Sequence, residues 1–279
     1  MASPPSTIKS SASPADSATI RFNDVWIGFD EQPVLRGLTF SAQPGETLVL
    51  LGETGTGKTL TLKMAAGLMC PDRGSVYALG QDITGKSEEE LLQIRRQIGF
   101  VFQEGALFDS FTVGENVAYR LVEDGADEDA VKPQVEEVLR FVELEHTIDM
   151  LPSELSGGMR RRVSIARAVV NRPPIVLYDS PTAGLDPITS QTIITLILRL
   201  RDIYRVTALM ATHRLQDGFA LANFHFDPKT RTVRRGSSGD TSNAPITRFL
   251  VLRDGHIYFE GGPEDLLKSK DSYLQRFLI

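Results

Sequence analysis

The chain has 279 residues, 41% of them hydrophobic, so it can bury a core large enough for one large domain or two small ones. Its formal net charge of −6 at pH 7 argues against a protein that coats nucleic acid. The single cysteine, Cys70, excludes an internal disulfide and indicates a thiol in a reducing compartment. No run approaches the roughly 18 apolar residues of a membrane-spanning helix, so we expect any membrane role to come through a partner.

The segment Met1 to Thr19 is rich in Ser, Ala and Pro and lacks the apolar stretch of a secretory signal. We therefore expect a disordered tail there. Two strands should follow, at Ile20 to Phe29 and Leu38 to Ala42. We expect them to form an antiparallel piece before a buried strand at Glu46 to Leu51.

This third strand leads directly into a glycine-rich loop, Gly52 to Thr59, with the sequence GETGTGKT. Its glycines let successive backbone N–H groups point inward, and the helix predicted from Lys58 adds the positive end of its dipole. The Lys58 ammonium would neutralise phosphate oxygens, and the Thr59 hydroxyl would supply a ligand for Mg²⁺. A turn that binds nothing is the alternative, but every fixed position of the motif is filled. We predict a triphosphate site formed by Gly52, Glu53, Thr54, Gly55, Thr56, Gly57, Lys58, Thr59 and Leu60.

Strands and helices alternate beyond the loop, which favours an α/β fold with a mainly parallel sheet covered by helices. The predicted helices are Lys58 to Leu68, ended by Pro71 and Gly74; Asp127 to Leu144, with Pro133 near its first turn; and Thr189 to Tyr204. The last of these lies between two short buried strands, Ile175 to Tyr178 and Val206 to Ala211.

Asp179 directly follows the apolar strand Ile175 to Tyr178. This position would place a carboxylate beside the Mg²⁺ expected at the glycine-rich loop. An Asp that caps the next turn would be the more common reading of such a residue alone. The complete phosphate-binding motif favours the metal role.

A second glycine-containing motif is LSGGM, residues 155–159, just before the helically spaced segment RRRVSIARAVV. Ser156, Gly157 and Gly158 would form a second helix start able to bind an anion. The segment lies too far along the chain to duplicate the first loop within one site. We therefore expect it to serve a second nucleotide.

Together these motifs resemble the ATP-binding subunit of ABC transporters over nearly all of Ile20 to Ile279. The resemblance implies a P-loop NTPase cassette with a mainly parallel core sheet, an antiparallel β subdomain and a helical subdomain at about residues 104–170. It implies one ATP-binding domain over residues 20–279, with ATP and Mg²⁺ as cofactors. It also implies a head-to-tail dimer, with an identical second subunit favoured. Each ATP then lies between one glycine-rich loop and the other chain's Ser156, Gly157, Gly158 and Met159.

The resemblance assigns further roles residue by residue. Phe29 stands where an aromatic side chain stacks on adenine, with a core phenylalanine as the alternative. Gln103, in GFVFQEG, matches the glutamine that reaches Mg²⁺ and the attacking water, and His213, in LMATHRL, matches the histidine that contacts the γ-phosphate. A structural histidine is the alternative for His213. Asp186, in AGLDP, matches an aspartate at the dimer seam. The implied catalytic set is Gln103, Asp179, Ser180 and His213, and the implied metal ligands are Thr59, Gln103 and Asp179.

Within this family the chain is most similar to the Mla-type ATPases of phospholipid and solvent-tolerance transport. The similar segments are EGALFDSFTVGENVAY from Glu104, LPSELSGGM from Leu151, DPITS from Asp186 and DSYLQRFL from Asp271. The resemblance implies a permease that docks near Gln103 to Tyr119, and a location at the cytoplasmic face of the inner membrane through that permease. Apolar Leu107, Phe108 and Phe111 suit such docking, although some of them could belong to the core.

Ser180 departs from the family pattern, which has a glutamate after the metal-binding aspartate. A serine hydroxyl is a poor base and is too short to hold the hydrolytic water from this backbone position. Two hypotheses follow: a motor subunit that turns over slowly, and a degenerate subunit that binds ATP without hydrolysing it. An ABC ATPase of DNA repair or translation is less favoured, because the chain has neither a coiled-coil insertion nor a second cassette.

Residues 223–248 form a longer link than the family usually has before its final strands. FHFDPKTRTVRR predicts a hairpin, and GSSGDTSNAP after it predicts a flexible segment. The hypothesis of contact with lipid headgroups or a partner competes with a solvated surface insertion. The basic residues of the segment are Lys229, Arg231, Arg234, Arg235 and Arg248.

Overall fold

The computed structural model describes residues 18–30, 32–236 and 245–276. The disordered tail expected at Met1 to Thr19 therefore lies outside the described residues up to Ser17. The flexible segment expected at Gly236 to Pro245 lies outside them over residues 237–244. Cys70 is a free, exposed thiol.

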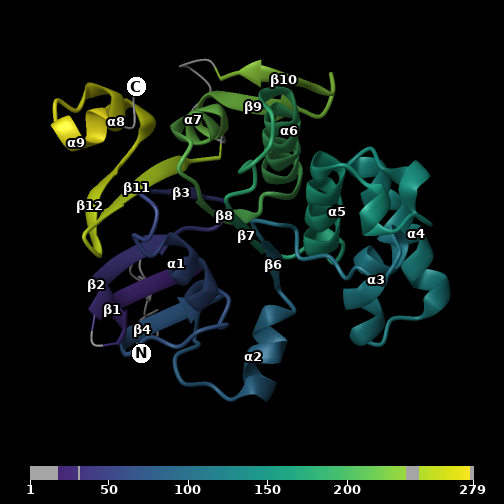
Figure 1. The fold of residues 1–279 in the computed structure, drawn as a ribbon, viewed down its shortest axis with the longest axis horizontal. Helices are drawn as coiled ribbons and strands as arrows, with labels where there is room; N and C mark the ends of the chain where they lie inside the picture. Colours follow the sequence, from purple (N-terminus) through teal and green to yellow (C-terminus); the bar gives the residue numbers. More distant parts are fainter. Residues whose placement is uncertain (1–17, 31, 237–244, 277–279) are drawn as a thin grey trace, which may run out of the picture.

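A six-stranded sheet forms the centre of the molecule (Figure 1). Its strand order is β12-β11-β3-β8-β7-β6, and all neighbouring strands are parallel except the antiparallel edge pair β11 and β12. Every residue of β3, β7 and β8 is buried, as expected for parallel strands that are covered on both faces. The strands are β3 (Thr47–Leu51), β6 (Ile98–Val101), β7 (Ile175–Asp179), β8 (Thr207–Ala211), β11 (Thr247–Arg253) and β12 (His256–Gly261). The predicted parallel core sheet is confirmed.

A second, antiparallel sheet has the order β2-β1-β4-β5; along the chain, β1 and β2 come before β3 of the central sheet, and β4 and β5 come after it. Its strands are β1 (Ile20–Phe29), β2 (Gln32–Ala42), β4 (Arg73–Ala78) and β5 (Gln81–Asp82). Helix α1 (Lys58–Ala65) contacts β4 of this sheet as well as β7 and β8 of the central one. The two sheets therefore share a helix, and the predicted antiparallel subdomain is confirmed.

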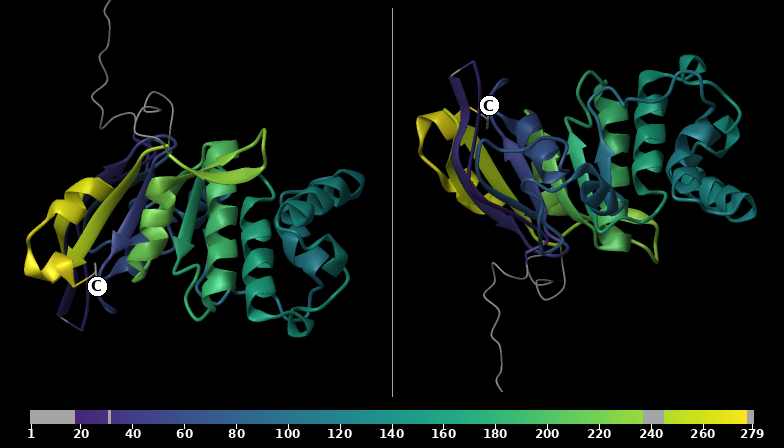
Figure 2. Two further views of the ribbon diagram at one scale, coloured as in Figure 1. Left: turned by 90° about the horizontal axis from the view of Figure 1, so that it is seen from above. Right: turned by 90° about the horizontal axis from the view of Figure 1, so that it is seen from below.

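Three helices form a lobe beside the central sheet, shown in teal in Figure 2. They are α3 (Val113–Glu123), α4 (Glu128–Phe141) and α5 (Gly157–Val169). Side chains cap their first turns: Thr112 accepts from the Glu115 N–H, Asp127 from the Asp129 N–H and Ser156 from the Met159 N–H. The remaining helices are α2 (Glu88–Arg95), α6 (Pro187–Tyr204), α7 (Leu215–Asn223), α8 (Pro263–Lys268) and α9 (Ser272–Gln275), with short 3₁₀ turns at Glu145–Thr147 and Pro152–Glu154.

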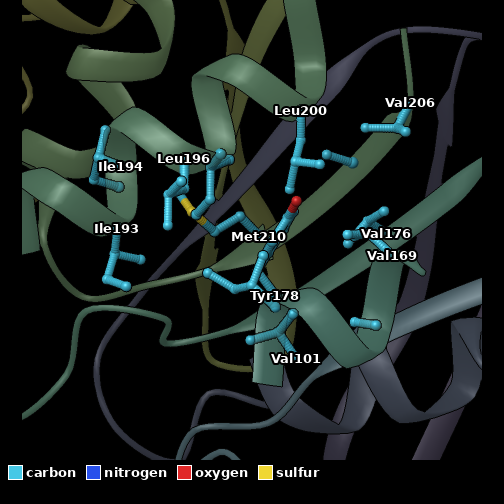
Figure 3. Packing of buried hydrophobic residues seen from close by; sticks show 14 of the residues in the cluster. Val101, Val169, Val176, Tyr178, Ile193, Ile194, Leu196, Leu200, Val206 and Met210 are labelled. Atoms are coloured by element: carbon cyan, nitrogen blue, oxygen red, sulfur yellow. The ribbon is translucent and has the colours of Figure 1, made fainter. Parts of the chain in front are cut away.

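Two hydrophobic clusters lie on opposite faces of the central sheet, because successive side chains of a strand point to opposite faces. Leu177 and Leu209 face the cluster that includes Leu62 of α1 and the antiparallel sheet. Tyr178 and Met210 face the cluster that includes α5 and α6 (Figure 3). The buried Tyr178 hydroxyl has no hydrogen-bond partner among the residues that the structure describes, and burial raises its pKa.

Two predicted helices end earlier than expected. Helix α1 stops at Ala65 and not at Leu68, because Gly67 adopts a left-handed φ of 64° and the Leu68 N–H turns back to the Lys63 carbonyl. Helix α4 stops at Phe141 and not at Leu144 for the same reason, since Glu143 has a φ of 60°. Pro133 lies in the interior of α4 and not near its first turn.

The hairpin predicted after α7 is present, as β9 (Phe224–Asp227) and β10 (Thr232–Arg235). Its neighbour in space is α6, which it crosses near the C-terminal end of that helix (Figure 1). Arg248, the last basic residue of the 223–248 segment, does not lie on this hairpin. It belongs to β11, where its Nε lies 2.7 Å from a carboxylate oxygen of Glu46, because β11 pairs with the strand that begins at Thr47.

None of the helices within the described ranges has the length and apolar composition needed to cross a membrane.

Candidate nucleotide-binding site

The last residue of the loop between β3 and α1 has a backbone conformation that favours glycine. Gly57, the residue just before α1, has a φ of 93°, and a Cβ added there would lie 2.4 Å from Leu35. Helix α1 has no acidic side chain in its first turn. Its N–H groups and dipole are thus available to an anion.

Lys58 folds back over this loop. Its Nζ donates to the carbonyls of Gly52 and Glu53, each at 2.8 Å. Burial lowers the pKa of Lys58, and the negative charge of Asp179 partly opposes this shift. Charged phosphate oxygens are stronger acceptors than neutral carbonyls, so a triphosphate in the loop could take over these hydrogen bonds.

Thr59 and Asp179 meet across the sheet edge. The Thr59 hydroxyl donates to the Asp179 carboxylate over 3.2 Å, although the residues are 120 positions apart. Asp179 is only 6% exposed, and burial raises its pKa, while the hydrogen bonds from Thr59 and Ser180 and the charge of Lys58 oppose the rise. A hydroxyl and a poorly solvated carboxylate are hard oxygen donors that fit Mg²⁺. The expected metal and the residues present are therefore compatible.

Ser180 follows Asp179 in a left-handed conformation with a φ of 47°. Its N–H donates to the Ala211 carbonyl at 2.8 Å, and its side chain opposes the rise that burial causes in the pKa of Asp179. The hydroxyl therefore influences the charge of the candidate metal ligand. It offers no carboxylate at the position where the family has one.

Gln103 and His213 each follow a strand of the same sheet by two residues, Gln103 after β6 and His213 after β8. Both side chains are exposed. The carboxyl ends of parallel strands meet at one sheet edge, which is where open α/β sheets bind their ligands. The structure therefore places both residues at the edge that carries Asp179 and the glycine-rich loop.

Two arginines that the sequence analysis did not single out support the segment around Gln103. Arg161 Nη1 donates to the Phe102 carbonyl at 2.6 Å, and Arg167 donates to the carbonyls of Gly105 and Ala106 at 2.9 and 2.8 Å. Both arginines lie on α5, within the RRRVSIAR stretch. Their i, i+6 spacing on a helix that follows LSGGM was the available signal, but sequence alone did not show what they contact.

A second set of contacts that the sequence did not predict lies next to the loop of His213. Asp217 of α7 accepts a hydrogen bond from the Thr182 hydroxyl, and burial raises its pKa. Arg214 lies 3.8 Å from Asp217 and donates to the Ser190 hydroxyl at 2.8 Å. These contacts connect the loop that carries His213 to the segment after β7 and to α6.

The start of α5 is open to solvent. Ser156 and Gly157 are exposed, and the first turn of α5 contains no acidic residue. Asp186 is also exposed and caps α6 by accepting from the N–H groups of Ile188 and Thr189, each at 3.0 Å. Phe29 is 51% exposed at the end of β1, so it is not a core residue. Its role in stacking on adenine stays a prediction.

The segment from Gln103 to Tyr119 presents an aromatic cluster. The Phe108 ring lies 5.2 Å from Phe111 and 4.7 Å from Tyr119, and Phe108 and Tyr119 are 40% and 38% exposed. Leu107, by contrast, packs against the hydrophobic core. Of the three apolar residues proposed for docking, Leu107 is thus a partly buried core residue.

Solved structures place this fold among ATP-binding cassettes. An ATP-binding cassette solved as a dimer in a post-hydrolysis state with ADP and Pi superposes with a TM-score of 0.72, at 28% identity, over 87% of this chain and 98% of that one. The fold is therefore that of a P-loop ATPase cassette.

Residues 35–183 match the family described as ABC transporter, and the chain belongs to this family. It is 35% identical over 92% of its length to the chloroplastic protein TRIGALACTOSYLDIACYLGLYCEROL 3 of Arabidopsis thaliana, covering 72% of that protein. It is 30% identical over 89% of its length to the intermembrane phospholipid transport system ATP-binding protein MlaF of Haemophilus influenzae, covering 85% of it. It is 42% identical over 82% of its length to the cell division ATP-binding protein FtsE of Escherichia coli, covering 92% of it. The predicted family, including its similarity to Mla-type ATPases, is confirmed.

Proposed function

We propose that this chain is the ATP-hydrolysing motor subunit of a transporter that moves a phospholipid or another apolar substrate. The contact between Thr59 and Asp179 carries the proposal, because it joins the glycine-rich loop to the carboxylate expected to hold Mg²⁺. Thr59, Asp179 and Gln103 would hold the ion, which would neutralise charge on the phosphates. Gly52 to Leu60 would bind the phosphates of ATP, and Phe29 would stack on the adenine.

In this proposal, two copies close on two ATP molecules. Ser156, Gly157, Gly158 and Met159 of one copy would complete the site of the other. The exposed start of α5 supports this role, since its N–H groups and helix dipole favour an anion and no carboxylate of its first turn competes. Asp186 would lie at the seam between the copies. The dimeric state of the related cassette supports the same arrangement.

Turnover would depend on Gln103 and His213, which would orient the water and contact the γ-phosphate. Arg161 and Arg167 hold the backbone on either side of Gln103, and the Asp217 group supports the loop of His213. Ser180 cannot act as an efficient base, because its hydroxyl is weakly basic. We therefore expect slow basal hydrolysis.

A permease would dock on the aromatic cluster of Phe108, Phe111 and Tyr119. A groove of about 280 Å³ lies beside it, lined partly by Phe108, Tyr119 and Arg167. Exposed aromatic side chains next to a groove are typical of helix-docking sites. The Arg161 and Arg167 contacts would connect this docking surface to the helix that begins at LSGGM. Attachment through the permease would place the chain at the cytoplasmic face of the inner membrane.

A lipid substrate is supported by the relatives whose names refer to phospholipid transport and to a glycolipid. The relative named for cell division is more identical over a shorter span, so identity alone does not select the substrate. The similar segments from Glu104, Leu151, Asp186 and Asp271 favour the lipid transporter. We further propose one ATP-binding domain over residues 20–279, because both sheets share α1 and the two hydrophobic clusters lie on opposite faces of one central sheet.

Ser180 favours a second candidate, a structural subunit that binds ATP with little hydrolysis. The two candidates differ in what the permease does to the ATPase rate. A motor should hydrolyse ATP faster when its permease is present in phospholipid vesicles, and should move a fluorescent phospholipid between leaflets or vesicles only when ATP is supplied. Phe108→Asp should abolish this stimulation without changing ATP affinity. A complex with ATP bound but no hydrolysis would support the structural subunit and contradict the motor.

A further inference from the structure

A cavity of about 530 Å³ lies where the C-terminal parts of α4, α5 and α6 meet the hairpin of β9 and β10. None of the residues around it belongs to a nucleotide motif. Its walls combine four guanidinium groups with two aromatic rings and an aliphatic floor. The residues that carry the inference are Arg140, Arg172, Arg199, Arg231, Phe141 and Tyr204.

Arg199 is the most enclosed cation of this cavity. Its side chain is 14% exposed, and its guanidinium lies 4.4 Å from the ring centroid of Phe141 and 5.4 Å from that of Phe226. Its Nη1 lies 3.4 Å from a Glu143 oxygen, but its buried Nε has no hydrogen-bond partner in the described ranges of the chain. A buried donor without an acceptor is costly, so this group favours a ligand that supplies one.

Positive charge exceeds negative charge around the cavity. Glu143 faces Arg199, and Glu137 lies 2.7 Å from Arg172. Arg140 and Arg231 have no carboxylate partner within the described part of the chain. Burial lowers the pKa of Arg199; Glu143 opposes this, but the charge of Arg231 lowers it further. An anion between these two arginines would remove that repulsion.

Arg231 reaches the cavity from an unfavourable backbone. It lies in the turn of the hairpin with a φ of 55°, a left-handed conformation that glycine or asparagine adopts more readily. A glycine at this position would therefore fit the turn at least as well as the arginine does.

We propose that this cavity binds a small organic anion, a carboxylate or phosphate joined to an apolar body. The volume lies within the range of small-molecule sites, and the mix of apolar walls with a few charged groups is typical of them. The arginines would hold the anionic group, and Val138, Val170 and Leu200 would contact the apolar body. The ligand would touch α4 and α5 of the helical lobe together with α6 and the hairpin. Its binding would hold these parts together independently of ATP.

The test uses the fluorescent anion anilinonaphthalene sulfonate with the full chain, at saturating MgADP so that the glycine-rich loop is occupied. We expect saturable binding of one probe per chain, weakened by added NaCl. Arg231→Gly removes the charge and relieves the left-handed backbone, so the fold should persist while affinity falls at least about tenfold. Arg235→Ala is the matched control, since it removes the same charge from the same hairpin but does not line the cavity. It should leave affinity unchanged.

Competition then identifies the chemistry. Octanoate and octyl phosphate should displace the probe, and inorganic phosphate should displace it much more weakly. Equal affinity of Arg231→Gly and Arg235→Ala would overturn the site. Displacement by inorganic phosphate as effective as by octyl phosphate would overturn the need for an apolar body. Displacement by an acidic peptide alone would overturn the assignment to a small molecule.

Discussion

Gly158 at the start of α5 lies directly against Thr189 at the start of α6. A Cβ added at Gly158 would lie 2.4 Å from Thr189 Cγ2. Thr189 has little freedom to move away, because its hydroxyl and its N–H both bond to the Asp186 carboxylate. The second glycine of LSGGM and the aspartate of AGLDP thus belong to one packed unit, in addition to any role toward a nucleotide.

This contact predicts a stability difference between two neighbouring glycines. Gly158→Ala should destabilise the chain by about 1–3 kcal/mol, the usual cost of overpacking. Gly157→Ala is the control, because its Cβ would meet nothing closer than Leu185 at 3.8 Å. Urea denaturation of the two variants measures the difference. Equal midpoints would show that α6 can move away from α5.

Lys58→Ala should weaken ATP binding by more than tenfold, because a charge-assisted hydrogen bond to phosphate contributes about 1.5–3 kcal/mol. Lys268→Ala is the control, since this lysine is exposed on α8 and pairs with Glu264. Calorimetry of both variants with MgATP measures the effect. Unchanged affinity in Lys58→Ala would contradict the proposed site.

Ser156→Asp separates the cap of α5 from its proposed role across the dimer. Aspartate is as good a helix cap as serine, so the melting temperature should stay close to that of the parent. Its carboxylate would repel the phosphates of an ATP bound by the other copy, so ATP-dependent dimerisation should be lost while the monomer still binds ATP. Light scattering with and without MgATP tests this, and an undiminished dimer would refute the composite site.

Ser180→Glu should raise ATP turnover at least about tenfold if the missing base limits hydrolysis, since a general base typically contributes about 10²–10⁴-fold. Ser180→Gln is the matched control, because it has the same size without a basic carboxylate. If Gln accelerates the reaction as much as Glu, shape and not base chemistry explains the gain. If the parent already hydrolyses ATP at about 1 s⁻¹, another residue supplies the base.

Asp179→Asn should stabilise the nucleotide-free chain at neutral pH, although it should weaken Mg²⁺-dependent ATP binding. Burial raises the pKa of Asp179, so its ionised form destabilises the folded state above that pKa. Below the unfolded-state pKa of about 3.9 both states are protonated and the effect disappears. The gain in melting temperature should therefore be present at pH 7 and shrink as the pH falls toward about 4.

Asp186→Asn provides a comparison of opposite sign. Hydrogen bonds from Thr189 lower the pKa of Asp186, so its ionised form stabilises the fold and the neutral variant should not gain stability at pH 7. Equal gains in both variants would show that removing any carboxylate relieves the net negative charge, and would contradict the burial argument.

The sequence by itself determined the family, the two sheets and most of the candidate nucleotide site. These features depend on local patterns: an apolar strand before Gly52, a glycine-rich helix start, and a carboxylate directly after another buried strand. Each motif follows a strand of one parallel sheet, and the carboxyl ends of parallel strands lie at the same sheet edge. The motifs therefore come together when their strands are neighbours in the sheet. The contact of Thr59 with Asp179 is the outcome.

Only the tertiary structure decided which charged and aromatic side chains are free and which have partners. Arg248 looked like part of a basic surface, yet it pairs with Glu46 across the sheet; Phe29 could have been a core residue, yet it is half exposed. In the sequence, Arg161 and Arg167 are simply part of a helical segment, but in the structure they hold the backbone around Gln103. The partners of a long side chain depend on which elements pack beside it, and residues far apart in sequence supply them, so no local pattern contains that information.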